Sequence, residues 1–115
     1  MSIRTERVSE EIKKVLSERL LRGLRDPLPG FVTIAGVDVT SDFTQAKVWV
    51  SVIGTEADKA EAMRVLADNR GALRKAVGDA IRLRNTPALT FALDEAGERA
   101  ARVWQILEDE KKKHG

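Results

Sequence analysis

The chain contains no cysteine, no tyrosine, a single histidine and no long apolar run. The lack of cysteine excludes a disulfide framework, a thiolate nucleophile and cysteine-ligated zinc or iron–sulfur chemistry, and it suits a reducing compartment. The apolar runs are far shorter than the roughly 20 residues of a membrane-spanning helix, and the N-terminus has no signal-peptide pattern. We therefore expect a soluble cytoplasmic protein without a membrane partner.

The side chains that usually carry catalysis are also scarce. The only histidine, His114, lies in a charged tail, so the commonest general base is missing from any folded site. Asp94 and Glu95 are adjacent at the end of a predicted strand, where they point to different sides and are better explained as a helix cap. Glycine-rich phosphate loops and metal-ligand spacings are absent. We predict no enzymatic activity, no cofactor, no metal and no small-molecule substrate.

The length and composition suit one globular domain. The chain has 115 residues, of which 43% are hydrophobic and 33% charged. We expect a monomer with a single domain over residues 1–115, in which residues 108–115 form a frayed charged tail. The net charge is only +2, but residues 62–93 carry six basic and two acidic side chains, whereas residues 31–61 are net negative. A polarised basic patch of this kind can bind phosphates.

Hydrophobic spacing predicts an α+β fold with the order αββααβα. Apolar residues three and four apart indicate helices over 5–24, 55–69, from 72 to the Arg84–Pro87 stop, and 96–107. Alternating residues indicate strands over 31–39, 46–53 and 89–93, with a β-bulge at Gly36 in the first. The first two strands should form a hairpin, and helices should cover one side of the three-stranded sheet.

The second and third helices meet at Asn69-Arg70-Gly71. Asparagine and glycine both tolerate a positive φ, so we expect a kink there that depends on Gly71. Beyond it, Arg70, Arg74 and Arg82 share one helix face with Gly78, and Lys75 flanks them. The arginines are a solvated face or a phosphate-binding stripe. Gly78, which is costly inside a helix, would allow close approach of a nucleic-acid backbone or of another helix.

The five aromatic residues do not form the RNP pattern with which sheet-faced RNA modules stack bases. Trp49 lies on the phase opposite to the valines of its strand. It is either an exposed stacking platform or, as we favour, a residue packed under a helix. Recognition through a helix-joint-helix surface is favoured over recognition through the sheet.

Several segments, taken together, resemble one family. They are Arg4-Thr5-Glu6-Arg7-Val8, Asp26-Pro27, Val37-Asp38-Val39-Thr40-Ser41-Asp42, Ala46-Lys47-Val48 and Arg82-Leu83-Arg84-Asn85-Thr86-Pro87-Ala88-Leu89-Thr90-Phe91 ending at Asp94. In this order and spacing, the chain resembles bacterial ribosome-binding factor A over nearly its whole length. The resemblance implies a type II KH-like fold in which an Ala-x-Gly kink between two helices replaces the GxxG loop. It also implies binding to the immature 30S subunit and 16S rRNA late in assembly, with help in 5′-end processing, notably in the cold.

In this chain the family kink corresponds to Asn69-Arg70-Gly71, so the glycine matches and the alanine does not. The resemblance implies RNA contact on the basic helix after the kink, with weaker candidates near the N-terminus. The candidate residues are Asn69, Arg70, Gly71, Arg74, Lys75, Arg82, Arg84, Arg4 and Arg7. Two alternatives remain at this stage, a helix-turn-helix DNA-binding regulator and a protein-interaction module whose basic face meets an acidic partner.

Overall fold

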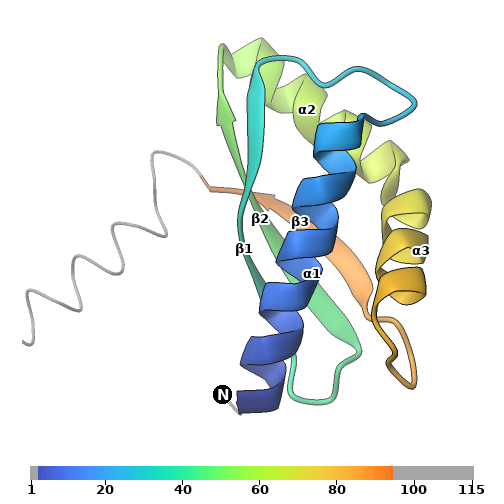
Figure 1. Ribbon diagram of the computed structural model, residues 1–115. Helices are drawn as coiled ribbons and strands as arrows, with labels where there is room; N and C mark the ends of the chain where they lie inside the picture. Colours follow the sequence, from blue (N-terminus) through green and yellow to red (C-terminus); the bar gives the residue numbers. More distant parts are fainter. Residues whose placement is uncertain (1–2, 95–115) are drawn as a thin grey trace, which may run out of the picture.

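Helices and strands follow one another in the order αββααβ in the computed structural model, which describes residues 3–94 (Figure 1). The elements are α1 (Ile3–Arg22), β1 (Phe31–Val39), β2 (Gln45–Ile53), α2 (Glu56–Asp68), α3 (Arg70–Ala80) and β3 (Ala88–Leu93). They confirm the predicted α+β class and the order of its first six elements. The predicted helix over 96–107 and the tail over 108–115 lie outside the described residues. No helix within residues 3–94 has the length and apolar character that crossing a membrane would require.

The sheet has the strand order β1-β2-β3, which the sequence did not determine. β1 and β2 pair antiparallel as the predicted hairpin, and β3 pairs parallel to β2. The register shifts between Ile34 and Gly36, so the bulge is present where the apolar phase slips. This shift brings Ile34, Val37 and Val39 into one core although their spacing is not regular. A parallel pair needs a long crossover, and α2 with α3 supplies it.

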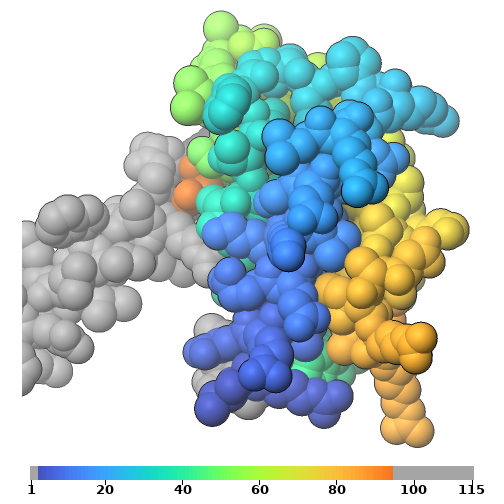
Figure 2. Space-filling view, viewed as in Figure 1, coloured from blue at the N-terminus to red at the C-terminus, as the bar shows by residue number. Residues whose placement is uncertain are grey.

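The three described helices all pack on the same face of the sheet (Figure 1). Alternate residues of β2, from Ala46 to Val52, are buried with the apolar stripe of α1. α2 adds Ala62 and Leu66 to this core, and α3 adds Leu73 and Val77. α1 and α3 lie side by side over the sheet, so their outer surfaces form one continuous side of the molecule (Figure 2).

α2 begins at a reciprocal cap formed by Thr55 and Asp58. The Thr55 hydroxyl accepts a hydrogen bond from the Asp58 amide, and the Asp58 carboxylate accepts one from the Thr55 amide. Two of the unpaired amides at the helix start are thereby satisfied. The cap ties α2 closely to the end of β2 and so helps direct the crossover.

α3 is shorter than the sequence predicts. It ends at Ala80, and Ile81 has extended dihedral angles, φ −123° and ψ 124°. The buried Ile81 side chain packs into the core, which turns the chain away from the helix axis. Arg82 therefore lies in the loop between α3 and β3, and the prediction that it shares a helix face with Arg70 and Arg74 is wrong.

Candidate nucleic-acid interface

The joint between α2 and α3 is made by a single residue, Asn69, whose φ is −99° and ψ 11°. Its side-chain amide donates to the Val65 carbonyl at 2.8 Å and to the Asp26 carboxylate at 3.4 Å. Only 7% of Asn69 is exposed. The amide thus satisfies a carbonyl at the end of α2 and ties the α1–β1 loop to the joint. The Asn69 side chain is therefore engaged within the protein, and its contact with RNA stays a prediction.

Gly71 does not have the backbone conformation that we predicted for it. Among the described residues, positive φ occurs only at Phe43, Gly23 and Gly30. A Cβ on Gly71 would meet no atom within 4 Å. The helix direction changes at Asn69 instead, through dihedral angles accessible to any residue near the bridge region. The expectation that the kink depends on Gly71 is therefore wrong.

The α3–β3 loop, residues 81–87, packs back on α3. A Cβ on Gly78 would lie 2.8 Å from the Thr86 hydroxyl oxygen. Four residues earlier on α3, the Arg74 guanidinium donates to the Thr86 carbonyl at 2.7 Å. The close approach at Gly78 is therefore made by a loop, and neither a helix nor a nucleic acid is needed to explain the glycine. Arg74 remains exposed, but it also positions this loop.

The cations of this region divide into free and paired groups. Arg70, Arg82 and Arg84 are exposed and form no ion pair with the described residues. Lys75 differs, because its ammonium contacts the Asp79 carboxylate at 2.9 Å, a hydrogen bond that raises the pKa of Lys75. Arg64 lies on α2 with Glu61 and Asp68 as partners, so its charge is compensated. The positive electrostatic potential at α3 and the following loop therefore comes mainly from these three arginines.

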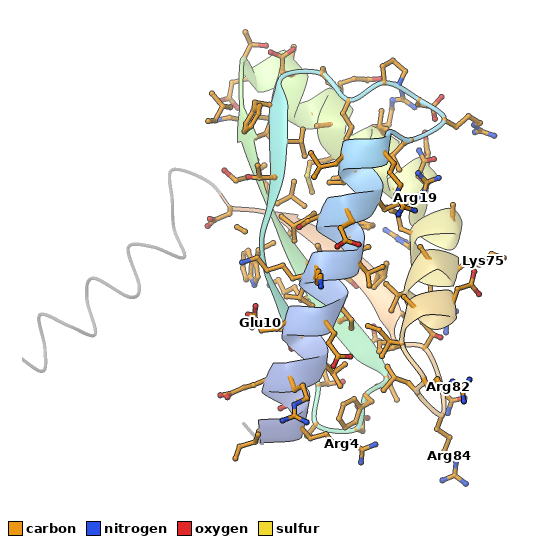
Figure 3. All side chains as sticks on the ribbon, viewed as in Figure 1. Arg4, Glu10, Arg19, Lys75, Arg82 and Arg84 are labelled. Atoms are coloured by element: carbon orange, nitrogen blue, oxygen red, sulfur yellow. The ribbon has the colours of Figure 1, made fainter. Side chains whose placement is uncertain are left out.

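Two hollows lie along this surface, which we call the basic face and define by α3, residues 70–80, and the α3–β3 loop. The first has a volume of about 480 Å³ and is lined by Gly71, Arg74, Lys75, Gly78, Asp79, Asn85 and Thr86. The second, about 280 Å³, is lined by Arg4, Asp42, Phe43, Thr44, Leu83, Arg84 and Asn85. Arg4 and Arg84 thus meet at one end of the molecule (Figure 3). Arg7 is exposed one turn along α1 but lines neither hollow.

Two arginines of α1 lie next to the basic face, although the sequence analysis did not name them as candidate RNA-binding residues. Arg19 and Arg22 line a groove between α1 and α3 together with Glu18 and Asp79. Figure 3 shows Arg19 directed toward α3. In the amphipathic pattern of α1, both arginines fall outside the apolar stripe. Sequence spacing alone does not show whether such residues face solvent or lie beside another helix. Arg19 also donates to the Gly23 carbonyl at 2.6 Å and so contributes to the end of α1.

Trp49 is partly buried on the face of the sheet opposite the described helices. The interpretation that it packs under a helix stays a prediction, because the predicted helix over 96–107 lies outside the described residues. Its indole N–H donates to the Asp38 carboxylate at 2.9 Å. The Lys47 ammonium lies 4.3 Å from the ring centroid. Both the edge and a face of the ring are therefore engaged within the sheet.

The potential metal ligands of the described region do not cluster. No group of three or more histidine, cysteine, aspartate or glutamate side chains within residues 3–94 could hold a metal ion. The hollows of the basic face instead combine arginine and one lysine with amide, hydroxyl and apolar groups, and each also includes one aspartate, Asp79 in the first and Asp42 in the second. Such a surface is suited to binding phosphates and bases.

Comparisons with known proteins give one consistent result. The family model described as ribosome-binding factor A matches residues 4–107. The ribosome-binding factor A of Desulforamulus reducens is 40% identical over 109 residues, which cover 95% of this chain and 91% of that protein. The crystal structure of ribosome-binding factor A from Thermus thermophilus has a TM-score of 0.69 and 25% identity, covering 80% of this chain and 98% of that one.

A further similar set of coordinates is a homology model of Thermus thermophilus ribosome-binding factor A as fitted into the cryo-EM map of its complex with the 30S subunit. It has a TM-score of 0.64 and 25% identity, covering 76% of this chain and 92% of that one. The matched structures have a KH-like fold. The observed sheet and the helix-kink-helix crossover agree with that architecture.

Proposed function

The chain belongs to the ribosome-binding factor A family, and from this premise we propose that it binds the immature 30S ribosomal subunit as an assembly factor. Its role is to hold 16S rRNA late in assembly and to assist processing of the 5′ end, without catalysing a reaction itself. The fitted complex of the similar Thermus thermophilus protein with the 30S subunit supports this assignment. A cytoplasmic site of action follows from the role.

The observation that carries the proposal is the set of uncompensated arginines on the basic face. Arg70, Arg82 and Arg84 can replace counterions on rRNA phosphates, which supplies affinity without reading sequence. Because these side chains come from both ends of α3, they can contact phosphates that a folded RNA brings together. Selectivity then comes from RNA shape and from bases that are not paired.

The geometry does not favour the DNA-binding alternative. A helix-turn-helix joins its two helices by a turn of three or four residues. Here only Asn69 separates α2 from α3, and both helices belong to a crossover between parallel strands. Within residues 3–94, neither helix of this pair is a separate recognition helix directed away from the domain.

Removing the free arginines tests the proposal. We expect the triple variant Arg70→Gln, Arg82→Gln, Arg84→Gln to bind immature 30S subunits more weakly and to have a flatter dependence of log K on log salt. The slope should fall by about 2 if each arginine contacts a phosphate. Arg74 is left unchanged because it holds the α3–β3 loop through Thr86. Filter binding across a salt series measures both quantities.

The matched control is Arg64→Gln, compared with the single variant Arg82→Gln. Both remove one positive charge, but Arg64 is already paired with acidic residues of α2. We expect only Arg82→Gln to lower the salt slope. Equal slopes for the two variants, or unchanged binding by the triple variant, would remove the basic face from the interface.

A further inference from the structure

A small hollow lies at the end of the molecule where three segments meet. These are the start of α1, the β1–β2 turn over residues 40–44 and the α3–β3 loop. Figure 3 shows Arg4, Arg82 and Arg84 at this end. The hollow, about 280 Å³, is slightly smaller than typical ligand pockets of roughly 300 Å³ and above. It could receive a single flat group but not a nucleic-acid helix.

The floor of the hollow includes an aromatic ring in an unusual backbone setting. Phe43 has a φ of 60°, which is rare for a bulky residue that is not glycine. The turn that holds it is closed by hydrogen bonds from Thr40 and Thr44 to the Asp42 carboxylate, at 2.7 to 3.1 Å. Phe43 is only partly buried against the core. The turn thus presents part of an aromatic side chain to the hollow.

A planar cation covers that ring. The Arg4 guanidinium carbon lies 5.1 Å from the centroid of Phe43, within the range of a cation–π interaction. Arg4 is exposed and has no ion-pair partner among the described residues. Leu83 adds an apolar wall, and Asn85 brings an amide that can donate and accept hydrogen bonds. A site for phosphate alone would not require the ring, the leucine or the planar arrangement.

We propose that this hollow binds one unpaired nucleobase of the bound RNA. The base stacks on the outer face of the Arg4 guanidinium, whose other face lies over the Phe43 ring, while Arg84 faces the adjoining phosphate and Asn85 the base edge. Proteins recognise single-stranded RNA in this manner, by stacking splayed bases on aromatic rings and guanidinium planes. The inference rests on the proposed function, because it assigns a base-binding subsite beside the phosphate-binding basic face.

The test compares short RNAs that carry bases with an RNA of the same length and charge that carries none. Fluorescence anisotropy at low salt is measured with hexameric oligoadenylate and oligouridylate and with an abasic hexamer of the same charge. We expect the protein to bind at least one base-containing hexamer roughly tenfold more tightly than the abasic hexamer, as one stacked base would provide. Arg4→Lys keeps the charge but removes the plane, so this ratio should fall toward one.

Two further variants complete the test. Arg25→Lys, the same change in the α1–β1 loop at a residue that does not line the hollow, should keep the ratio. Phe43→Leu keeps an apolar side chain but removes the ring, and its melting temperature checks that the turn still folds. A ratio near one in the unaltered protein, or an undiminished ratio in Arg4→Lys, would overturn the base subsite.

Binding of the unaltered protein to immature 30S subunits is measured in parallel. Failure of that binding contradicts the proposed function. Normal subunit binding with no preference for bases contradicts only the base subsite. Chemical probing of 16S rRNA then adds a direct readout, because we expect Arg4→Lys to lose protection of an unpaired base while phosphate-dependent binding persists.

Discussion

Asn69 shows how one side chain can join two helices without a loop. Its backbone N–H reaches carbonyls at the end of α2, and its amide donates to the Val65 carbonyl. The dihedral angles at this residue turn the chain into α3 without a positive φ. Because Asn69 makes the turn between the helices, the turn does not require a glycine at position 71. Gly71 then has either a different role or no specific role.

Gly71→Ala separates these two possibilities. The added methyl group meets no atom and no positive φ is required, so the free energy of unfolding should rise by about 0.5 kcal/mol through helix propensity and a less flexible unfolded chain. Urea denaturation measures the change. A destabilised variant would contradict the observed joint, whereas a stabilised variant with weakened 30S binding would show that the glycine serves close approach of RNA.

Gly30→Ala is the contrasting control. Gly30 has a φ of 67°, and a Cβ there would lie 2.8 Å from the Ile53 carbonyl oxygen. We expect a loss of about 1 to 3 kcal/mol, because a strained backbone and a close contact with main chain both oppose the substitution. Opposite signs at the two glycines would confirm that only one of them is required by backbone geometry.

At the scale of elements, the β1–β2 turn depends on a charged acceptor. Hydrogen bonds from the Thr40 hydroxyl and then from Thr44 hold the pKa of Asp42 below its ordinary value of 3.8. The ionised carboxylate is therefore the form that the folded turn favours. The same turn holds Phe43 with its positive φ, so the charge of Asp42 and the proposed base subsite are structurally linked.

The stabilisation from Asp42 should depend on pH. Since its folded-state pKa lies below the unfolded value, the contribution is present above pH 3.8 and is lost as the pH falls through the folded-state pKa. We expect Asp42→Asn to be less stable than the unaltered protein at pH 7 and the difference to disappear in strong acid. Urea unfolding at a series of pH values measures this.

Glu10→Gln supplies the control for that series. Glu10 is exposed on α1 and has no hydrogen bond or ion pair with the described residues. Its substitution should leave the pH dependence nearly unchanged. A difference between Asp42→Asn and the unaltered protein that does not vary with pH would contradict a role for the ionised carboxylate.

At the scale of the whole molecule, β2 is the central strand of the sheet and also contributes residues to the core. It pairs with both other strands, and its inward residues Val48 and Val50 are fully buried. The basic face lies on the helical side, where α1 and α3 are adjacent. The position of the arginines therefore depends on the packing of the crossover helices over β2.

Val50→Ala should show this dependence on the central strand. Removing two buried methyl groups from a residue that is 0% exposed should cost about 2 to 3 kcal/mol in the free energy of unfolding. Val32→Ala, on the partly exposed start of edge strand β1, should cost about 1 kcal/mol. Thermal or urea unfolding measures both, and equal costs would contradict the central role of β2.

Some features of this molecule follow from local sequence patterns. The apolar spacing of α1, the bulge at Gly36 and the cap at Thr55 are each encoded within a few residues, because periodicity and capping are short-range effects. The absence of cysteine and the scattering of glycine excluded whole classes of chemistry. The candidate RNA-binding residues were predicted from charge and from the family resemblance, and they stay predictions.

Other features were decided only by the tertiary structure. Ile81 leaves the helical pattern because its side chain is buried in the core, and this moves Arg82 from a helix face into a loop. The close approach of Thr86 explains why position 78 of α3 is a glycine. Phe43 and Arg4, which are distant in the sequence, lie in contact. The strand order also depends on the crossover. Each of these depends on tertiary contacts, whose energies local periodicity does not contain.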